Sequence, residues 1–280
     1  MIAPFPHLAC PLDGQPLQAE GGSLRCASGH AFDVAAEGHV HLLPVQFKRS
    51  KAPGDDKAMV AARRRFLQAG HYAPLAQTVA RCVSEALPGP APLACLDAGC
   101  GEGYYLRQLG CWLGEEREFM PVGLDISKWA VQSAARQGGG RTWVVGSNAR
   151  LPILPESLDA VLCLFGFPVA AEFARVLRPG GLLLQLDPGP QHLRELREIL
   201  YPSLHERSAK SAAVPAGFAP ERREWLSFDI GLDSTQEIAD LLIMTPHLHR
   251  ATPQARAQAF ALSQLRLTVE VCVQTFRRLA

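Results

Sequence analysis

Short apolar runs alternate with amphipathic segments along the last two-thirds of the chain. Apolar residues dominate the runs "LACLDAG", "FMPVGLDI", "RTWVVG", "LDAVLCLF" and "GLLLQLD", and the segments between them, such as "SKWAVQSAARQ" and "AAEFARVL", repeat apolar residues at helical spacing. Near-continuous apolar runs of this length are typical of parallel strands that are covered on both faces. The alternation therefore predicts an α/β domain over residues 91–280, built on a Rossmann-like, doubly wound sheet.

The chain ahead of this domain has a different pattern. Residues 1–45 hold only short apolar pieces among prolines, glycines and histidines, which predicts a small β-rich module. Because so few residues can bury only a small surface, a module of this size needs additional stabilisation, such as a bound metal ion. Residues 46–90 begin with a turn-rich linker and continue as two helices, the first ending near Gly70 and the second covering about 72–87.

The segment after the fifth apolar run is less uniform. It predicts a helix near 191–200, irregular chain to about 222, a strand at "REWLSFDIGL", a helix at "STQEIADLLI" and a last strand at "LRLTVEVCV".

Hydrophobic residues make up 48% of the 280 residues and charged residues 20%, and no apolar run reaches the 18 or so residues of a membrane span. The N-terminus has no basic region followed by an apolar one, so we expect no secretory signal and a cytoplasmic enzyme that does not bind membranes.

Basic residues gather between positions 47 and 65, although the whole chain has a net charge of only +1. Two acidic residues, Asp55 and Asp56, stand there among seven basic ones, which gives a local charge of +5. The basic residues are Lys48, Arg49, Lys51, Lys57, Arg63, Arg64 and Arg65. Such a patch can meet the phosphates of a nucleic acid. The same charges also fit a solvated linker and an exposed helix face, and charge alone does not separate the two interpretations.

A glycine-rich turn follows the first strand of the predicted sheet. It reads Asp97-x-Gly99-x-Gly101-x-Gly103, which is tighter than the Gly-x-Gly-x-x-Gly loop that sets a helix N-terminus against a pyrophosphate. Ligands of open α/β sheets bind at this carboxyl edge. The acid and the tight spacing favour S-adenosylmethionine (SAM), which carries no phosphate. Glycines let the backbone approach this cofactor, and carboxylates meet its cationic groups.

Three further features follow in the order in which a SAM-binding domain has them. The second strand ends at Asp125, 22 residues beyond Gly103, where ribose hydroxyls need an acceptor. Ser147 and Asn148 follow the third strand, and we expect one of them to read the adenine amino group. The helix, Pro-Gly-Gly turn and strand of "VLRPGGLLL" complete the series. Together they predict a class I SAM-dependent methyltransferase fold; the alternative is an α/β domain whose glycines only form a turn.

On these and further stretches the chain resembles the 23S rRNA (guanine-N1)-methyltransferases of the RlmA type, which combine an N-terminal zinc ribbon with a class I SAM domain. The matching stretches are "CASGHAFDVAAEGHVHLLPVQFKRSKAPGD", "ARRRFLQAGHYAPL", "LDAGCGEGYY", "GLDISKWAV", "RVLRPGG", "PGPQHLRELREILY" and "LLIMTPHLHRA". The resemblance runs from Cys10 to about Arg250 and so covers nearly the whole chain.

The resemblance implies methyl transfer from SAM to N1 of a guanine in a hairpin of 23S rRNA close to the peptide exit tunnel. It also implies a homodimer whose subunits together form an RNA-binding cleft. By the matching motifs, SAM contacts fall to Tyr72, Glu102, Gly103 and His192. Which of the neighbouring guanines is methylated does not follow from the sequence.

The N-terminal module carries a zinc-ribbon pattern with one unusual ligand. The spacing is Cys10-x2-Asp13-x12-Cys26-x3-His30, whereas the family that the chain resembles has a cysteine at the second position. Aspartate is a legitimate zinc ligand, but a carboxylate in place of a thiolate weakens binding at a structural site. We expect these four residues to hold zinc in a ribbon that faces RNA. The alternative is a metal-free turn in which Asp13 accepts a backbone N–H group.

Methylation of guanine N1 sets two requirements, because this atom carries a proton at neutral pH. The enzyme must expose the base, and extrusion from a loop with stacking on an aromatic side chain achieves this. Phe165 and Phe167, at the end of the fourth strand, are the candidates for stacking, although both also fit a role as core residues. The enzyme must also remove the proton, and Asp187 and His192 are candidate general bases between which the sequence does not decide.

Two other functions remain open. A SAM-dependent methyltransferase of a small molecule would not need the N-terminal ribbon or the basic helix "ARRRF". A catalytically inactive rRNA-binding assembly or resistance factor would not need the intact glycine loop and Asp125, although these residues indicate binding and not turnover.

Overall fold

The computed structural model describes residues 5–48, 50, 52–203 and 213–280. Arg49 and Lys51 of the predicted basic patch lie outside the described residues, as does the middle of the segment that we expect to be irregular before position 222. Within the described ranges, no helix is both long enough and apolar enough to cross a membrane.

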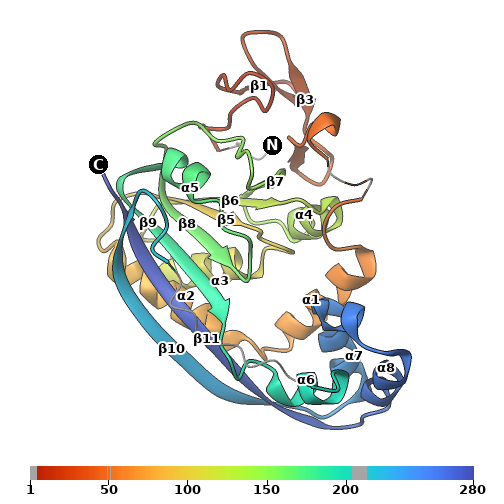
Figure 1. Ribbon diagram of the computed structural model, residues 1–280. Coiled ribbons are helices and arrows are strands. Elements are labelled where there is room, and N and C mark those ends of the chain that lie inside the picture. The colour runs from red at the N-terminus through yellow and green to blue at the C-terminus, as the bar shows by residue number, and fades with distance from the viewer. Residues whose placement is uncertain (1–4, 49, 51, 204–212) are drawn as a thin grey trace.

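An eight-stranded sheet forms the centre of the molecule (Figure 1), in the order β10-β11-β9-β8-β5-β6-β7-β4. Its five central strands run parallel to one another: β5 (Leu93–Ala98), β6 (Phe119–Asp125), β7 (Thr142–Val145), β8 (Leu158–Leu164) and β9 (Leu177–Pro188). Numbered in chain order these strands are arranged 3-2-1-4-5, which is the order of a doubly wound sheet. The predicted α/β fold and its five apolar strands are confirmed.

Both edges of this parallel group are extended. On one side β11 (Leu265–Arg278) runs antiparallel to β9, and β10 (Phe218–Leu232) runs antiparallel to β11. On the other side β4 (His39–His41) pairs in parallel with β7. Because β4 comes from the N-terminal module, this pairing joins the module to the central sheet.

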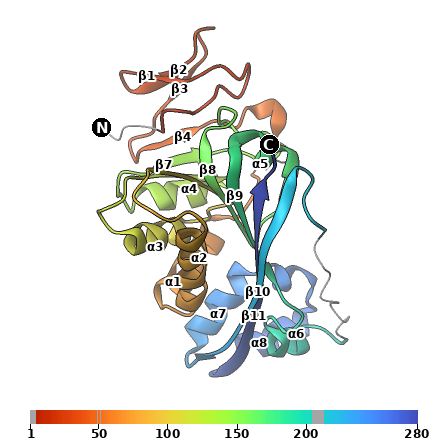
Figure 2. The same ribbon diagram turned by 90° about the vertical axis from the view of Figure 1, so that its left-hand side faces the viewer.

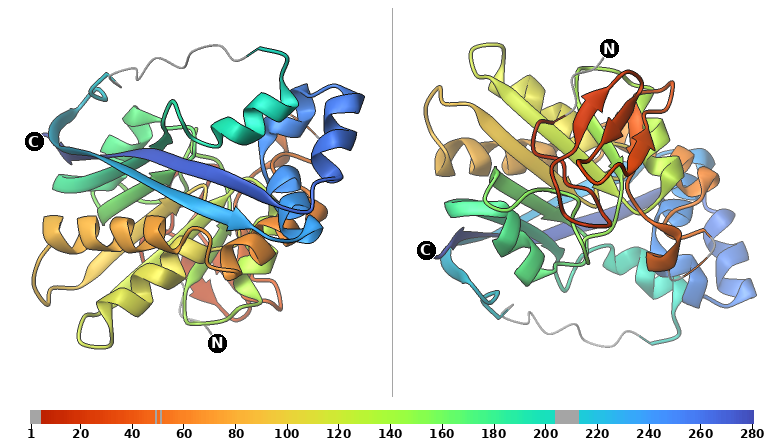
Figure 3. Two further views of the ribbon diagram at one scale, coloured as in Figure 1. Left: turned by 90° about the horizontal axis from the view of Figure 1, so that it is seen from below. Right: turned by 90° about the horizontal axis from the view of Figure 1, so that it is seen from above.

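Helices cover both faces of the sheet (Figure 3). One face shares an apolar core with α2 (Ala73–Ala86), α3 (Tyr104–Leu113) and α4 (Lys128–Ala135). The opposite face shares a second core with α5 (Ala170–Val176). Burial on both faces explains why the parallel strands are almost uniformly apolar.

The N-terminal module contains a separate antiparallel sheet, and Figure 2 shows it above the edge of the central one. Its strands are β1 (Gln18–Glu20), β2 (Ser23–Arg25) and β3 (Ala31–Asp33). Buried residues of the module, including Leu8 and Leu24, belong to the same core as the α5 face of the central sheet. The small β-rich module predicted from the sequence is confirmed.

A group of helices lies beyond the carboxyl ends of the parallel strands (Figure 2). The group comprises α1 (Lys57–Gln68), α6 (Arg194–Leu200), α7 (Thr235–Met244) and α8 (Pro253–Phe260), with the short 3-10 turn η2 (Pro246–Arg250). A second 3-10 turn, η1 (Val45–Phe47), follows β4 beside the N-terminal module. Asp56 caps α1, because its carboxylate accepts the N–H of Met59 at 2.9 Å. The patterns predict α1, α2, α6 and α7 but not α8, which buries only Ala259 and therefore has no apolar stripe.

Candidate functional site

Two glycines of the loop between β5 and α3 have different structural roles. Gly99, Gly101 and Gly103 all have positive φ angles, of 106°, 55° and 84°. A Cβ atom at Gly99 would meet nothing within 4 Å, so the backbone there borders open space. A Cβ atom at Gly103 would instead lie 2.3 Å from the Trp143 ring, which is buried beneath the loop. Gly99 thus leaves room for a ligand, and Gly103 lets the loop pack closely on β7.

Asp97 is buried at the start of this loop. Only 1% of its surface is exposed, and neither carboxylate oxygen has a hydrogen-bond partner among the described residues. Burial, with a smaller contribution from the charge of Asp125, raises the pKa of Asp97 to about 8. A buried acid without a partner is costly to keep, and a cationic group of a ligand would supply that partner.

Asp125 lies beside the loop at the end of the neighbouring strand. One carboxylate oxygen accepts the N–H of Gly101 at 2.9 Å, and the other accepts the N–H of Ser127 at 2.8 Å. Burial raises the pKa of Asp125. Asp125 therefore ties the end of β6 to the glycine loop and brings a second acid to the same edge of the sheet.

Glu102 is held within the protein. Its carboxylate is fully buried and accepts hydrogen bonds from Arg107, at 2.7 and 2.9 Å, and from Gln137, at 2.7 Å. The side chain therefore anchors the glycine loop to α3 and to the end of α4.

Asn148 reaches the site from the turn after β7. Its side-chain amide donates to the carbonyl oxygens of Ala98 and Phe167, at 3.2 and 3.4 Å, and so fixes its own orientation. The amide oxygen of Asn148 is buried and has no partner among the described residues, which leaves it as an acceptor for an amino group. Ser147 uses its hydroxyl locally, to accept the N–H of Ala149.

Three aromatic rings gather at the same edge of the sheet. The ring of Tyr72 is stacked against that of Phe165, with centroids 6.2 Å apart, and the His192 ring lies 5.7 Å from Phe165 and 6.4 Å from Tyr72. Phe165 has a positive φ of 53°, an unusual conformation for a bulky residue and one that clusters at functional sites. Phe167 points away, with 88% of its surface exposed. Asp187 ends β9 half-buried, and burial raises its pKa.

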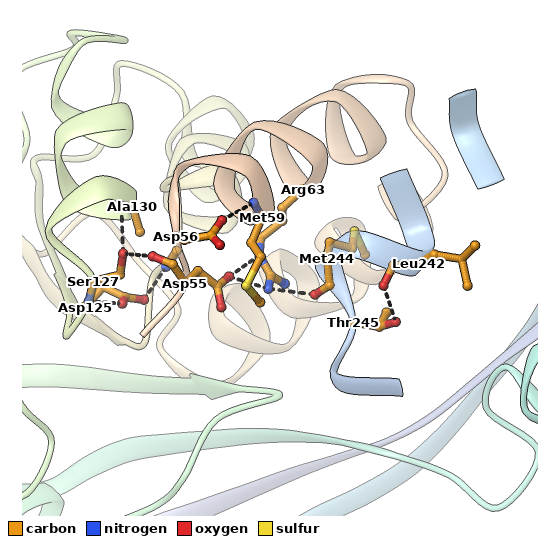
Figure 4. Close-up of polar contacts among 11 residues, drawn as sticks. Asp55, Asp56, Met59, Arg63, Asp125, Ser127, Ala130, Leu242, Met244 and Thr245 are labelled. Atoms are coloured by element: carbon orange, nitrogen blue, oxygen red, sulfur yellow. Dashed lines mark hydrogen bonds and ion pairs between the residues drawn. The ribbon is translucent and has the colours of Figure 1, made fainter. Parts of the chain in front are cut away.

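The structure adds residues that the sequence did not indicate, and Figure 4 shows them beside Asp125. Arg63 of α1 forms an ion pair with Asp55 at 2.6 Å and donates to the carbonyl oxygen of Met244 at 2.9 Å. Its aliphatic stem lies against the glycine loop, 3.6 Å from where a Cβ atom at Gly101 would be. The sequence counted Arg63 and Asp55 only as charges, because a contact between a linker, a helix and a distant carbonyl has no periodic signature.

The linker between the N-terminal module and α1 is hydrogen-bonded to Ser127, which follows β6. The hydroxyl of Ser127 donates to the carbonyl oxygen of Asp55 at 2.5 Å. Gly54 has a φ of 79°, and a Cβ atom there would lie 2.8 Å from the side chain of Ser127. We call residues 52–56 the strap, since they connect the N-terminal module to α1 and close against the end of β6.

A second cluster lies in the N-terminal module, where Cys10, Asp13, Cys26 and His30 bring their ligand atoms within 4.8 Å of one another. The two carboxylate oxygens of Asp13 contact different groups. One oxygen accepts the N–H of Gln15 at 3.0 Å, which lowers the pKa of Asp13, and the other lies 3.1 Å from His30 Nδ1 and 3.4 Å from Cys26 Sγ. The turn and the ligand cluster are therefore compatible. Two thiolates, an imidazole and a carboxylate form a donor set that suits tetrahedral zinc.

Two family models match the chain. The family model described as "RlmA, N-terminal", a zinc ribbon, matches residues 8–51. The model described as "Methyltransferase domain" matches residues 96–185, from the end of β5 into β9. The first range contains all four candidate metal ligands, and the second contains the glycine loop, Asp125 and Asn148.

Relatives that match most of the chain extend these results. The 23S rRNA (guanine(748)-N(1))-methyltransferase of Streptomyces fradiae is 36% identical over 215 residues, which are 76% of this chain and 74% of that protein. Two relatives are provisionally named 23S rRNA (guanine-N(1)-)-methyltransferases: one from Micromonospora griseorubida is 37% identical over 69% of each chain, and YxjB of Bacillus subtilis is 32% identical over 86% of each. With a ribbon of the RlmA type, a SAM-dependent methyltransferase domain and this degree of identity over most of its length, the chain belongs to the family of 23S rRNA (guanine-N1)-methyltransferases.

Proposed function

We propose that the protein transfers the methyl group of SAM to N1 of a guanine in a hairpin of 23S rRNA near the peptide exit tunnel. We propose further that it acts in the cytoplasm, as a homodimer. The observation that carries the proposal is that relatives named 23S rRNA (guanine-N1)-methyltransferases match 69 to 86% of the chain. In this arrangement residues 1–45 bind RNA, residues 91–280 carry the chemistry, and residues 46–90 connect them.

Several acceptor groups at the carboxyl edge of the central sheet are suited to binding SAM. The carboxylate of Asp97 would pair with the cationic amino group, and Asp125 retains acceptor capacity for ribose hydroxyls. The buried amide oxygen of Asn148 would accept from the adenine amino group. Gly99, which borders open space, and Gly101, which the Arg63 stem approaches, would present bare backbone to the cofactor. Bound there, SAM supplies a methyl group activated by the positive charge of its sulfonium.

The other proposed SAM contacts differ in kind. Tyr72 and His192 lie together beside Phe165, where they would flank the methionine end of the cofactor. Glu102 and Gly103 would contribute backbone, because the carboxylate of Glu102 is occupied by Arg107 and Gly103 packs on Trp143.

The target guanine would enter between the aromatic cluster and the end of β9. Phe165 is the stacking candidate that the geometry favours, because its ring adjoins Tyr72 and His192 while Phe167 points outward. Asp187 and His192 are the candidate acceptors of the N1 proton. The raised pKa of Asp187 makes its carboxylate a stronger base once ionised. Holding the base in line with the methyl group contributes to the rate as well.

Zinc fits the four clustered side chains of the N-terminal module. Cys10, Cys26 and His30 would supply three ordinary ligands, and the Asp13 oxygen that faces them would supply the fourth. The ion would cross-link two turns of a module that has little core of its own, and would stabilise the conformation of its RNA-facing surface.

Primer extension tests the proposal directly. The protein is incubated with SAM and unmodified 23S rRNA, and reverse-transcriptase stops are mapped, because a methyl group on N1 blocks base pairing. A new stop at one guanine, absent without SAM, is expected. If the protein binds SAM but produces no stop, the proposal is wrong, and methylation of a small molecule or a non-catalytic role would take its place.

A further inference from the structure

A basic groove lies between α1 and α4. It encloses about 640 Å³ and is lined by the exposed sides of both helices. Lys57, Arg64 and Arg65 come from α1, and Trp129 and the nearby Arg136 come from α4 and its end. A smaller hollow continues from Trp129 toward the N-terminal module, where its walls include Lys128, Lys48 and His41 at the end of β4.

Three of these cations are exposed and have no acidic partner among the described residues. Arg65 is paired with Asp240 and Arg136 with Glu37. Arg64, Lys57 and Lys128 form no ion pair with any described residue, and all three are exposed. Lys57 and Arg64 face the groove, and Lys128 faces the adjoining hollow, whose walls also include Asp55 and Asp56. Asp55 is paired with Arg63 and Asp56 caps α1, so the unpaired cations dominate the local charge and attract a polyanion.

Trp129 stands at the centre of these charges. The ammonium groups of Lys57 and Lys128 lie 4.2 and 4.4 Å from the centre of its ring. The ring is half-buried and belongs to neither apolar core. An aromatic plane flanked by cations, at a groove and not in a core, is the arrangement that binds a nucleotide base together with its phosphates.

The strap lies between the smaller hollow and the methyl-transfer site. Ser127, two residues before Trp129, caps α4 and also holds the strap through the carbonyl oxygen of Asp55. The same strap forms a wall of the smaller hollow, while Asp125 and Arg63 lie against its other side. A strand bound in the groove would therefore connect the N-terminal module to the edge of the sheet where SAM is held.

We propose that the α1–α4 groove binds the rRNA strand that flanks the target guanine, with one base stacked on Trp129 and phosphates on Lys57, Arg64 and Lys128. The inference rests on the proposed function, from which it takes the RNA substrate. Charge and ring chemistry favour RNA over a second copy of this chain, whose net charge of +1 offers no general attraction to a basic groove.

Binding of unmodified 23S rRNA to the full-length protein, measured over a series of salt concentrations, tests the groove. Arg64→Ala combined with Lys128→Ala is expected to weaken binding and to reduce the salt slope by about 2, since each lost phosphate contact removes about 1. Trp129→Ala is expected to weaken binding about tenfold, whereas Trp129→Phe keeps a stacking plane and most of the affinity. SAM affinity should be unchanged in all of them, which also verifies folding.

Arg256→Ala is the matched control, because Arg256 is an exposed arginine of α8 without an ion partner among the described residues. If wild-type protein methylates 23S rRNA and the groove variants bind it as tightly as wild type and Arg256→Ala, the inference is overturned and the proposed function stands. A change of oligomeric state without a change in RNA affinity also overturns it, in favour of a contact between copies. If wild-type protein binds SAM but neither binds nor methylates 23S rRNA, the proposed function fails and the inference fails with it.

Discussion

Asp97 shows how one side chain can couple cofactor binding to pH. Its carboxylate is buried without a partner, and its pKa is raised to about 8. Without a ligand, the acid is therefore protonated at neutral pH. A cation placed against it would stabilise the ionised form, so that SAM binding would release the proton.

SAM affinity is accordingly expected to rise with pH between about pH 5.5 and pH 7.5, by up to about tenfold per unit. Isothermal titration in two buffers of different ionisation enthalpy should show release of close to one proton at neutral pH. Asp97→Asn should bind SAM more weakly and with little pH dependence over this range. An unchanged pH profile in this variant would contradict the assignment of Asp97.

The same carboxyl group affects the stability of the free protein. Its folded pKa of about 8 lies above the value of about 3.9 in an unfolded chain, so the folded state holds a proton that the unfolded state has released. Its contribution to stability is complete below about pH 4 and is lost as the pH rises through 8. The melting temperature of Asp97→Asn relative to wild type should therefore increase from pH 5 to about pH 8 and then level off.

Asp13 allows a test of the unusual metal ligand. Asp13→Cys supplies the thiolate that related ribbons have, and zinc should bind about tenfold or more tightly, a difference of about 1.4 kcal/mol. Asp13→Ala leaves three ligands and should reduce the zinc content. Competition with a chelator measures both. Asp33→Asn is the control, because Asp33 is an exposed acid of the same module that is hydrogen-bonded to Ser23 outside the cluster. Equal zinc affinity in all variants would show that Asp13 is not a ligand.

At the level of elements, the strap depends on the absence of a side chain at Gly54. A Cβ atom there would lie within 2.9 Å of Ser127 and Ile126, so Gly54→Ala must displace the strap from the end of β6. We expect the variant to lose about 1–3 kcal/mol of stability and to bind SAM more weakly. Thermal melting and titration with SAM measure the two effects.

Gly89→Ala is the control variant that separates the effect of the steric clash at Gly54 from the effect of backbone strain. Gly89 also has a positive φ, of 94°, but a Cβ atom there would meet nothing within 4 Å. This variant should lose only the stability that strain costs and should keep its SAM affinity. If both variants bind SAM equally well, the strap has no part in holding the cofactor.

The elements also show what the sequence could and could not predict. Asp97, the glycines and Asp125 were predictable, because buried parallel strands and the turns after them leave a local pattern. The four candidate metal ligands were predictable from spacing alone. Arg63 and the strap were not, because their contacts join the linker, α1 and Met244 across the chain. The pairing of β4 with β7 was missed for the same reason, since three residues of a strand do not indicate which sheet they join.

At the scale of the whole molecule, the N-terminal module is built into the methyltransferase fold. β4 extends the central sheet, and the N–H groups of Ala9 and Leu154 donate to the carbonyl oxygens of Pro152 and His7, both at 2.9 Å. Buried residues of the module also share a core with the α5 face. A module joined by backbone hydrogen bonds and a common core should not unfold independently.

Removal of the metal tests this coupling. Because the ligand turns of the module belong to the same core as the central sheet, chelation should lower the melting temperature of the whole chain while leaving a single calorimetric transition. Cys10→Ser, which removes a candidate ligand, should melt lower than wild type and respond little to the chelator. Two separate transitions, of which only the lower one shifts on chelation, would mean that the module folds on its own. In that case the metal would act on the RNA-facing module alone, and the methyltransferase sheet would be stable without it.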